Sequence, residues 1–245
     1  MSASRASGLA ASAAGGARDQ QPGVAAPPAA SAATFLFADI AGFTALTEAH
    51  GDEEAASLAA DFCAAVQAQL PDCDGTHVKS IGDALMLRIP DPEQAVLLGL
   101  RIVGDLMRDH GAPAVRVGLH HGSAVQRDGD YFGATVNLAA RVSAHAVGGE
   151  VLLTAHTAAL APTIDGVLYE SRGRQELRNV RDPVELIAAV RIGEATPTHL
   201  AIDPVCHMAV DPERAAGRLV YNNTTYFFCT LACAGDFAHR PERFT

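Results

Sequence analysis

One stretch near the start of the chain most restricts how it can fold: Phe35-Leu36-Phe37-Ala38-Asp39-Ile40-Ala41-Gly42-Phe43-Thr44. The apolar residues before Asp39 predict a buried strand with an acidic side chain at its C-terminal end. Gly42 then permits a tight turn, and a helix-favouring run follows from Ala45. A carboxylate beside free backbone N–H groups suits a divalent cation that carries a polyphosphate. A purely structural Asp at a strand end is the alternative.

The composition limits the possible partners. The 245 residues leave room for one or two domains, and 49% of them are hydrophobic, enough for a core. The net charge of −10 argues against nucleic acid as a partner. The sequence has no uninterrupted apolar window of about 18 residues, so we expect no membrane span. Five cysteines without a secretion signal favour reduced thiols and a cytoplasmic location.

The order of the predicted elements indicates an α+β sandwich, in which helices cover a mostly antiparallel sheet. Expected strands are 34–39, 76–79, 84–89, 115–119, 151–154, 167–169 and 184–190; expected helices are 45–70, 92–108 and 134–146, with a glycine-flanked loop at 129–133. The composition divides the chain into a disordered Ala-rich tail, a main domain, a linker and a small C-terminal unit: 1–33, 34–192, 193–200 and 201–245.

A second acidic group lies in a predicted hairpin turn, Lys79-Ser80-Ile81-Gly82-Asp83. Antiparallel pairing can bring Asp83 beside Asp39, and two carboxylates that converge at strand ends can hold two divalent ions. An ordinary turn residue is the alternative, since Gly-Asp pairs are common in turns.

A third polar group consists of Asp130, Asn137 and Arg141. Asn137 and Arg141 are four residues apart in a predicted helix, so they share one face. An amide beside a guanidinium suits the charge that develops on a phosphorus centre during transfer. Two polar residues on a solvated helix face are the alternative.

Together the three stretches resemble the catalytic domain of class III nucleotidyl cyclases, over about residues 34–192. The matching motifs are Phe37-Ala38-Asp39-Ile40-Ala41-Gly42-Phe43-Thr44, Lys79-Ser80-Ile81-Gly82-Asp83, and Asp130-Tyr131-Phe132-Gly133-Ala134-Thr135-Val136-Asn137-Leu138-Ala139-Ala140-Arg141. The resemblance implies a ferredoxin-like cyclase sandwich.

The resemblance also implies roles for the phosphate and metal contacts. Asp39, Asp83 and the Ile40 carbonyl correspond to ligands of two Mg²⁺ or Mn²⁺ ions, and the amides around Phe43 and Thr44 to the cradle of the terminal phosphates. The family also has a basic phosphate ligand near the end of the domain. Arg178 is the best match, with Arg172 and Arg174 as alternatives, because the family commonly has Lys-Gly where this chain has Arg178-Asn179.

Base selection and transition-state stabilisation follow from the same resemblance. Lys79 and Asp130 correspond to the base-selecting pair, and they complement the N1 acceptor and the N6 donor of adenine. Asn137 and Arg141 correspond to the stabilisers of the transition state. In this family the metal residues come from one protomer and the other residues from its partner.

The expected activity is conversion of ATP to 3′,5′-cyclic AMP and pyrophosphate. One metal lowers the pKa of the ribose 3′-hydroxyl, which attacks the α-phosphorus in line, and the second metal holds the leaving pyrophosphate. Because this chain carries both sets of residues, we expect a symmetric homodimer with two sites. A cyclase with another purine selectivity and a catalytically idle nucleotide- or metal-binding sensor are the alternatives.

The C-terminal unit contains Cys206, Cys229 and Cys233, a set that suits zinc, copper or another soft ion. Residues 202–244 resemble the YHS domain, a small treble-clef-like module, although that family usually has Gly where His207 stands. Three reduced core cysteines without a metal are the alternative.

The remaining His and Cys residues have structural interpretations. His120 and His121 are expected to cap or pack, Cys63 to occupy the core, and Cys73 to lie exposed in a turn.

Overall fold

The computed structural model describes residues 32–105, 111–192 and 200–245. The strands of its larger part are β1 (Ala32–Ile40), β2 (Thr76–Ile81), β3 (Ala84–Ile89), β4 (Val115–Ser123), β5 (Val125–Arg127), β6 (Asp130–Phe132), β7 (Val151–Thr154), β8 (Val167–Gln175) and β9 (Val184–Arg191). The helices are α1 (Phe43–His50), α2 (Asp52–Gln67), α3 (Pro92–Gly104), α4 (Ala134–His145) and α5 (Ala155–Leu160), with a 3₁₀ turn at Leu70–Cys73.

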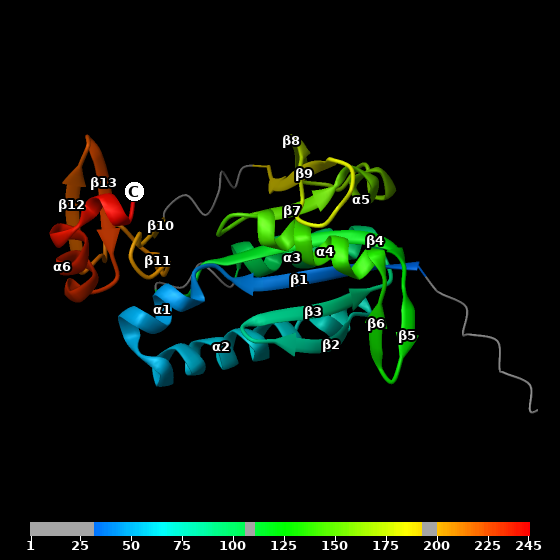
Figure 1. The fold of residues 1–245 in the computed structure, drawn as a ribbon, viewed down its shortest axis with the longest axis horizontal. Coiled ribbons are helices and arrows are strands. Elements are labelled where there is room, and N and C mark those ends of the chain that lie inside the picture. The colour runs from blue at the N-terminus through cyan, green and yellow to red at the C-terminus, as the bar shows by residue number, and fades with distance from the viewer. Residues whose placement is uncertain (1–31, 106–110, 193–199) are drawn as a thin grey trace, which may run out of the picture.

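Seven of these strands form one sheet, in the order β2-β3-β1-β4-β7-β9-β8 (Figure 1). Every neighbouring pair runs antiparallel except β4 and β7, which run parallel. The predicted α+β sandwich with a mostly antiparallel sheet is therefore confirmed.

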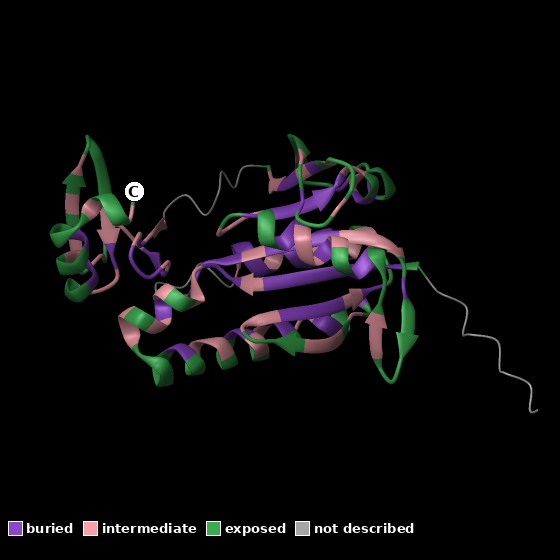
Figure 2. Ribbon diagram, in the orientation of Figure 1, coloured by how far each residue is buried: buried purple, intermediate pink, exposed green. Residues whose placement is uncertain are grey.

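Strand β1 lies inside this sheet, between β3 and β4, and is buried along most of its length (Figure 2). Because successive side chains alternate between the two faces of a strand, Leu36 and Ala38 join the core beneath α1, α2 and α3. Phe35 and Phe37 pack on the other face, against α4. Asp39 continues the second set, so it lies on the α4 side near the C-terminal end of the strand.

The predicted single helix at 45–70 is wrong, because the chain forms two helices, α1 and α2, that meet at Gly51. Gly51 adopts φ +89°, a conformation that breaks a helix and that glycine tolerates. Acidic residues at 52–54 occupy the first turn of α2, where they interact favourably with the helix dipole.

The predicted loop at 129–133 is also corrected. Asp130, Tyr131 and Phe132 form strand β6, which pairs with β5 in a short hairpin that turns at Asp128 and Gly129. Strands of three residues are too short to give a periodic pattern. The other predicted strands and helices are present, and β4 and β8 extend beyond their expected C-terminal ends.

The C-terminal part contains two small hairpins and a helix. Its elements are β10 (Ala201–Ile202), β11 (Ala209–Val210), β12 (Gly217–Tyr221), β13 (Thr224–Phe228), α6 (Leu231–His239) and a 3₁₀ turn at Pro241–Arg243. The ring of Phe237 packs against Phe228 and Tyr226, with centroids 5.2 and 4.8 Å apart. The treble-clef-like topology of this part stays a prediction.

The two parts are joined by backbone hydrogen bonds. The Ala114 N–H donates to the His207 carbonyl at 3.0 Å, and the Ala209 N–H donates to the Ala112 carbonyl at 2.7 Å. Met208 also forms a β-bridge with Pro113. Buried side chains of the C-terminal part belong to the same apolar cluster as the core beneath α1 and α3.

Two predicted segments lie largely outside the described residues: the tail at 1–33 and the linker at 193–200. The structure describes only the last two tail residues, which already belong to β1, and Leu200 of the linker. The expected end of the helix at 92–108 is also outside the described residues. No helix in 32–105, 111–192 or 200–245 is both long and apolar enough to cross a bilayer.

Candidate active site

The carboxyl groups of Asp39 and Asp83 converge where β1 ends and β3 begins. Asp39 lies next to last in β1, and Asp83 directly precedes β3, its antiparallel neighbour. Burial and then the nearby Asp39 charge raise the pKa of Asp83 to about 6. Such coupling requires proximity, so the predicted pair does come together. Ile40 is buried beside Asp39 as the last residue of β1.

Arg116 is a member of this site that the sequence reasoning missed. Its guanidinium donates to one carboxylate oxygen of Asp39, from Nε at 2.8 Å and from Nη2 at 2.5 Å. Arg116 stands directly opposite Asp39 in the register of β1 and β4. An Arg in the strand that pairs with β1 was a visible signal, but the register needed to place it was not known.

The turn after β1 presents the first helical amides. Gly42 adopts φ +73° immediately before α1, and α1 begins at Phe43. The N–H groups of a first helical turn have no intrahelical acceptor, so those around Phe43 and Thr44 are available to an anion. Thr44 is exposed and Phe43 half-buried.

Lys79 and Asp130 form an ion pair. The Lys79 Nζ lies 2.5 Å from Asp130 Oδ2 and 5.6 Å from the centroid of the Phe132 ring. Asp130 Oδ1 accepts a hydrogen bond from the Tyr131 N–H at 2.7 Å. The hydrogen bond from Lys79 is the main cause that lowers the pKa of the Asp130 carboxyl. The two predicted base-selecting residues are thus adjacent.

A cavity of about 410 Å³ opens beside this ion pair. Lys79 and Asn137 line it together, with Phe37 and Tyr131 among the apolar walls, whereas neither Asp39 nor Asp83 does. Within one chain the predicted metal ligands therefore face a different space from Lys79 and Asn137.

Two large apolar side chains that line this cavity are exposed. Ile81 is 53% and Phe132 49% accessible, and both line the cavity. Exposed large apolar groups around a polar site are typical of a surface that another chain covers.

The predicted basic residues differ in their partners. Arg172 is paired with Glu150 and Glu170, at 2.9 and 3.0 Å, and Arg174 donates to the Pro183 carbonyl. Among the described residues Arg178 and Arg141 have no ion-pair partner. Arg178 is exposed and Arg141 half-buried.

The predicted structural roles of His120 and His121 agree with their contacts. The Nδ1 of His120 lies 2.8 Å from Thr154 Oγ1, and the Nδ1 of His121 lies 3.0 Å from Thr34 Oγ1. Cys63 is half-buried against the core. The expectation that Cys73 is exposed is wrong, because the 3₁₀ turn folds it inward and leaves it 4% accessible.

The C-terminal part brings its three cysteines together. Cys229 Sγ lies 3.3 Å from Cys206 Sγ and 3.9 Å from Cys233 Sγ. His207, which follows Cys206, adopts φ +62°. This left-handed conformation is one that glycine adopts without strain, which fits the glycine that the YHS domain usually has at this position.

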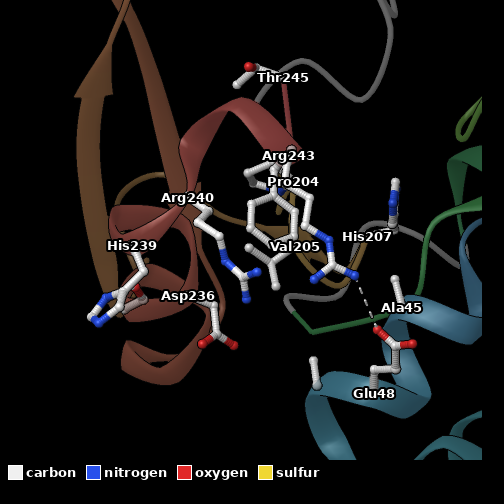
Figure 3. Close-up of a pocket in the computed structure, with 13 residues that line it drawn as sticks. Ala45, Glu48, Pro204, Val205, His207, Asp236, His239, Arg240, Arg243 and Thr245 are labelled. Atoms are coloured by element: carbon white, nitrogen blue, oxygen red, sulfur yellow. Dashed lines mark hydrogen bonds and ion pairs between the residues drawn. The ribbon is translucent and has the colours of Figure 1, made fainter.

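A larger cavity, about 760 Å³, lies between α1 and the C-terminal part (Figure 3), and none of the predicted site residues lines it. Glu48 and Arg243 approach to 4.0 Å across it. Charged residues from both parts of the chain line it, so the cavity lies at the interface between the two domains.

Comparison with known proteins identifies the family. A sequence profile of the adenylate and guanylate cyclase catalytic domain matches residues 26–188, and a profile of the YHS domain matches residues 201–245. A pH-sensitive adenylate cyclase of Mycobacterium tuberculosis is 36% identical over 167 residues, which cover 67% of this chain and 42% of that relative. An adenylate cyclase of Streptomyces griseus is 37% identical over 118 residues, which cover 48% and 29%.

Solved structures agree on the fold. An adenylyl cyclase from P. aeruginosa superposes with a TM-score of 0.59 at 23% identity, over 66% of this chain and 95% of that one. An adenylate cyclase from Trypanosoma brucei superposes with a TM-score of 0.60 at 22% identity, over 67% and 91%. The sequence profile and the fold thus define the class, that of nucleotidyl cyclase catalytic domains.

The chain belongs to the adenylate and guanylate cyclase catalytic-domain family, and a YHS domain follows the catalytic domain. The chain spans less than half the length of the two curated relatives named above.

Proposed function

We propose that this protein is an adenylate cyclase that converts ATP to 3′,5′-cyclic AMP and pyrophosphate at sites shared by two copies of the chain. The observation that carries the proposal is the convergence of Asp39 and Asp83, where burial and then the Asp39 charge raise the pKa of Asp83 to about 6. Two carboxylates that repel each other in this way form a site that divalent cations stabilise.

The oxygen ligands at the end of β1 fit Mg²⁺ or Mn²⁺, because both are hard cations that prefer oxygen ligands. Asp39, Asp83 and the Ile40 carbonyl would hold them. When bound, such ions make the ribose 3′-hydroxyl more acidic and neutralise the phosphates. The amides around Phe43 and Thr44 bind the terminal phosphate oxygens, at the positive end of the α1 dipole.

Lys79 and Asp130 select adenine. The ammonium group donates to the N1 acceptor, and the carboxylate accepts from the N6 amino group. Their ion pair holds both groups in place before substrate arrives, which lowers the entropy lost on binding. The adjacent cavity of about 410 Å³ has apolar walls that suit a purine ring.

Asn137 and Arg141 stabilise the charge that develops at the α-phosphorus, and Arg178 binds a phosphate. Arg178 has no ion-pair partner within 32–105, 111–192 and 200–245, which supports it over Arg172, already paired with two carboxylates. The separation of the Lys79 cavity from Asp39 and Asp83 supports a homodimer, because a second chain would bring its own cavity to the carboxylates. The exposed Ile81 and Phe132 provide apolar surface for that contact.

The C-terminal domain is proposed to be an accessory module that binds a soft metal through Cys206, Cys229 and Cys233. The sulfur atoms of Cys206 and Cys233, at 3.3 and 3.9 Å from that of Cys229, support this role, because thiolates at such spacing repel each other unless a cation lies among them.

A direct assay of the purified full chain tests the catalytic proposal. We expect cyclic AMP from ATP with Mg²⁺ or Mn²⁺, and much less cyclic GMP from GTP. Asp39→Asn should reduce turnover by a factor of at least about 100, since it removes the charge of a metal ligand. Binding of ATP without any cyclic product would instead favour the idle nucleotide sensor.

A further inference from the structure

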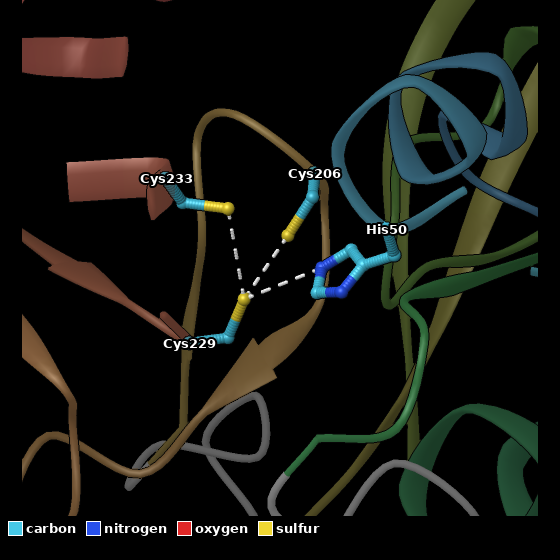
Figure 4. Close-up of side chains that lie close together, drawn as sticks. All are labelled: His50, Cys206, Cys229 and Cys233. Atoms are coloured by element: carbon cyan, nitrogen blue, oxygen red, sulfur yellow. Dashed lines mark hydrogen bonds between the residues drawn. The ribbon is translucent and has the colours of Figure 1, made fainter. Parts of the chain in front are cut away.

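A fourth ligand-bearing side chain, from the cyclase domain, completes the cysteine cluster. His50 is the last residue of α1, and its Nε2 lies 3.6 Å from Cys229 Sγ. The three sulfur atoms and one ring nitrogen of His50 lie within 4.8 Å of one another (Figure 4). The cluster thus draws on two parts of the chain separated by about 150 residues of sequence, counted from His50 to Cys206.

The spacing matches tetrahedral coordination. With metal–sulfur bonds of about 2.3 Å and a metal–nitrogen bond of about 2.0–2.1 Å, tetrahedral angles separate two sulfurs by about 3.8 Å and sulfur from nitrogen by about 3.5 Å. The observed sulfur–sulfur distances are 3.3 and 3.9 Å, and the sulfur–nitrogen distance is 3.6 Å. A disulfide would require about 2.05 Å between sulfurs, so the cysteines are free.

A carboxylate lies near the side of the His50 ring that faces away from the sulfur atoms. Its other ring nitrogen, Nδ1, lies 3.6 Å from a carboxylate oxygen of Glu54, which belongs to the first turn of α2. A carboxylate on the far side of the imidazole is the arrangement that orients metal-bound histidines and strengthens them as ligands.

Side chains of Asp203 and Thr230 hold the cysteines in place by accepting hydrogen bonds from backbone N–H groups at or next to them. The buried carboxylate of Asp203 accepts from the Cys229 N–H at 2.8 Å and from the Val205 N–H at 2.9 Å, so it ties together the loops of two ligands. Thr230 Oγ1 accepts from the Cys233 N–H at 3.1 Å and caps α6.

The other nearby histidine has a different role. His207 directly follows Cys206, yet it is not part of the cluster. Its ring packs on Gly42, where an added Cβ would lie 2.3 Å from His207 Cδ2. The C-terminal domain therefore touches α1 at both ends, through His207 beside Gly42 and through the cysteines beside His50.

We propose that His50, Cys206, Cys229 and Cys233 form a tetrahedral Cys₃His site for a zinc-like divalent ion, shared between the cyclase domain and the YHS domain. The inference deepens the proposed accessory thiolate site by adding a ligand from the catalytic domain. The ion then acts as a cross-link that holds the C-terminal end of α1 against the module.

The test uses the full chain, stripped of metal under reducing conditions and titrated with Co²⁺ as a spectroscopic substitute for Zn²⁺. We expect one tightly bound Co²⁺ per chain at this site, with the intense visible bands of tetrahedral thiolate coordination, and displacement of that Co²⁺ by Zn²⁺. His50→Ala should weaken binding by about 100-fold and alter the bands. His207→Ala, the matched control, should change neither.

A second variant tests whether any loss of binding in His50→Ala comes from misfolding. His50→Cys offers a fourth thiolate and should restore tight binding with a spectrum shifted toward four-sulfur coordination. Unchanged Co²⁺ affinity and bands in His50→Ala would overturn the role of His50, as would a His50→Cys chain that binds no better than His50→Ala.

The outcomes also separate this inference from the others. A parent chain that gives no thiolate bands would overturn the thiolate site as a whole. Asp39→Ala should leave the bands unchanged, so a failure of the proposed cyclase activity would not be mistaken for a failure here.

Discussion

Arg116 donates both of its hydrogen bonds to the same carboxylate oxygen of Asp39, at 2.8 and 2.5 Å. Asp39 is also a proposed ligand of the catalytic cations, so the guanidinium and an incoming cation compete for one carboxylate. We therefore expect Arg116 to hold the Asp39 carboxylate in place and to lower its affinity for cations.

Arg116→Ala should therefore tighten Mn²⁺ binding. Release of two charge-assisted hydrogen bonds at a partly exposed site is expected to raise affinity about three- to tenfold. Electron paramagnetic resonance of free Mn²⁺ during titration measures this directly. Arg127→Ala, at an exposed position in β5, serves as the control. Equal affinities for the parent and Arg116→Ala chains would show that no competition exists.

Shared active sites should be detectable by mixing two inactive chains. A heterodimer of Asp39→Ala and Asn137→Ala chains contains one site with both substitutions and one intact site. Because random pairing makes half of the dimers mixed, we expect about a quarter of the parent activity. Asp39→Ala mixed with Asp83→Ala should recover no activity, since both substitutions remove a cation ligand, and each site takes its cation ligands from one chain. No recovery in the first mixture, with heterodimers verified by native mass spectrometry, contradicts sharing.

Lys79 is the only lysine in the sequence, so lysine-directed acetylation reports on it selectively. A bound adenine should shield its ammonium group, which now contacts Asp130. We expect 3′-deoxy-ATP to slow acetylation of Lys79 about fivefold or more, and GTP to slow it much less. Mass spectrometry follows the modified peptide, and the N-terminal amine is the internal control. Equal protection by both nucleotides would argue against base selection by Lys79.

The close contact between Gly42 and His207 predicts a coupled pair of substitutions. Gly42→Ala places a methyl group against the imidazole and strains a residue with φ +73°, so we expect a loss of about 2–4 kcal/mol in the free energy of unfolding. Adding His207→Gly should recover part of this loss. Gly166→Ala, with φ +76° and open space around it, isolates the backbone strain. Urea denaturation measures all three, and equal losses for Gly42→Ala and Gly166→Ala would contradict the contact.

Burial of His120 predicts a dependence of stability on pH. Burial first, and then the neighbouring His156 and His121, lower the pKa of His120 to about 4, from about 6.5 in the unfolded chain. The unfolded state therefore binds the proton more readily, so this contribution is complete above pH 6.5 and is lost as pH falls toward 4.

His120→Asn should remove that contribution, about 2 kcal/mol for a partly buried ring, while an amide can still contact Thr154. Urea unfolding between pH 4 and 7 gives the slope for each chain. The exposed His239→Asn is the control, and a slope in His120→Asn equal to that of the parent chain would contradict the prediction.

Local patterns were enough to predict the elements around β1, because a run of apolar residues, a glycine turn and a helical period each have a direct physical cause. Local patterns did not by themselves pair Asp39 with Asp83 or Lys79 with Asp130, because each pair joins separate parts of the sequence. Antiparallel pairing allowed the first contact, and the resemblance to the cyclase family implied the second. The break at Gly51 was missed because the apolar spacing continues across it, and only the φ of +89° reveals it.

Residues whose partners lie far away in sequence could not be found in this way. Arg116 reaches Asp39 only through the register of β1 and β4, and His50 reaches Cys229 only through the docking of the C-terminal domain. Neither residue has a distinctive local pattern, and both depend on how the elements pack.

Helix α1 has eight residues, from Phe43 beside the turn of Gly42 to His50 beside the cysteines. Each residue of an α-helix advances the chain by about 1.5 Å and turns it by about 100°. Inserting or deleting a single residue in α1 would therefore rotate His50 away from the sulfur atoms while Gly42 stayed under His207. The length of this short helix is a constraint on evolution that neither domain would impose if it stood alone.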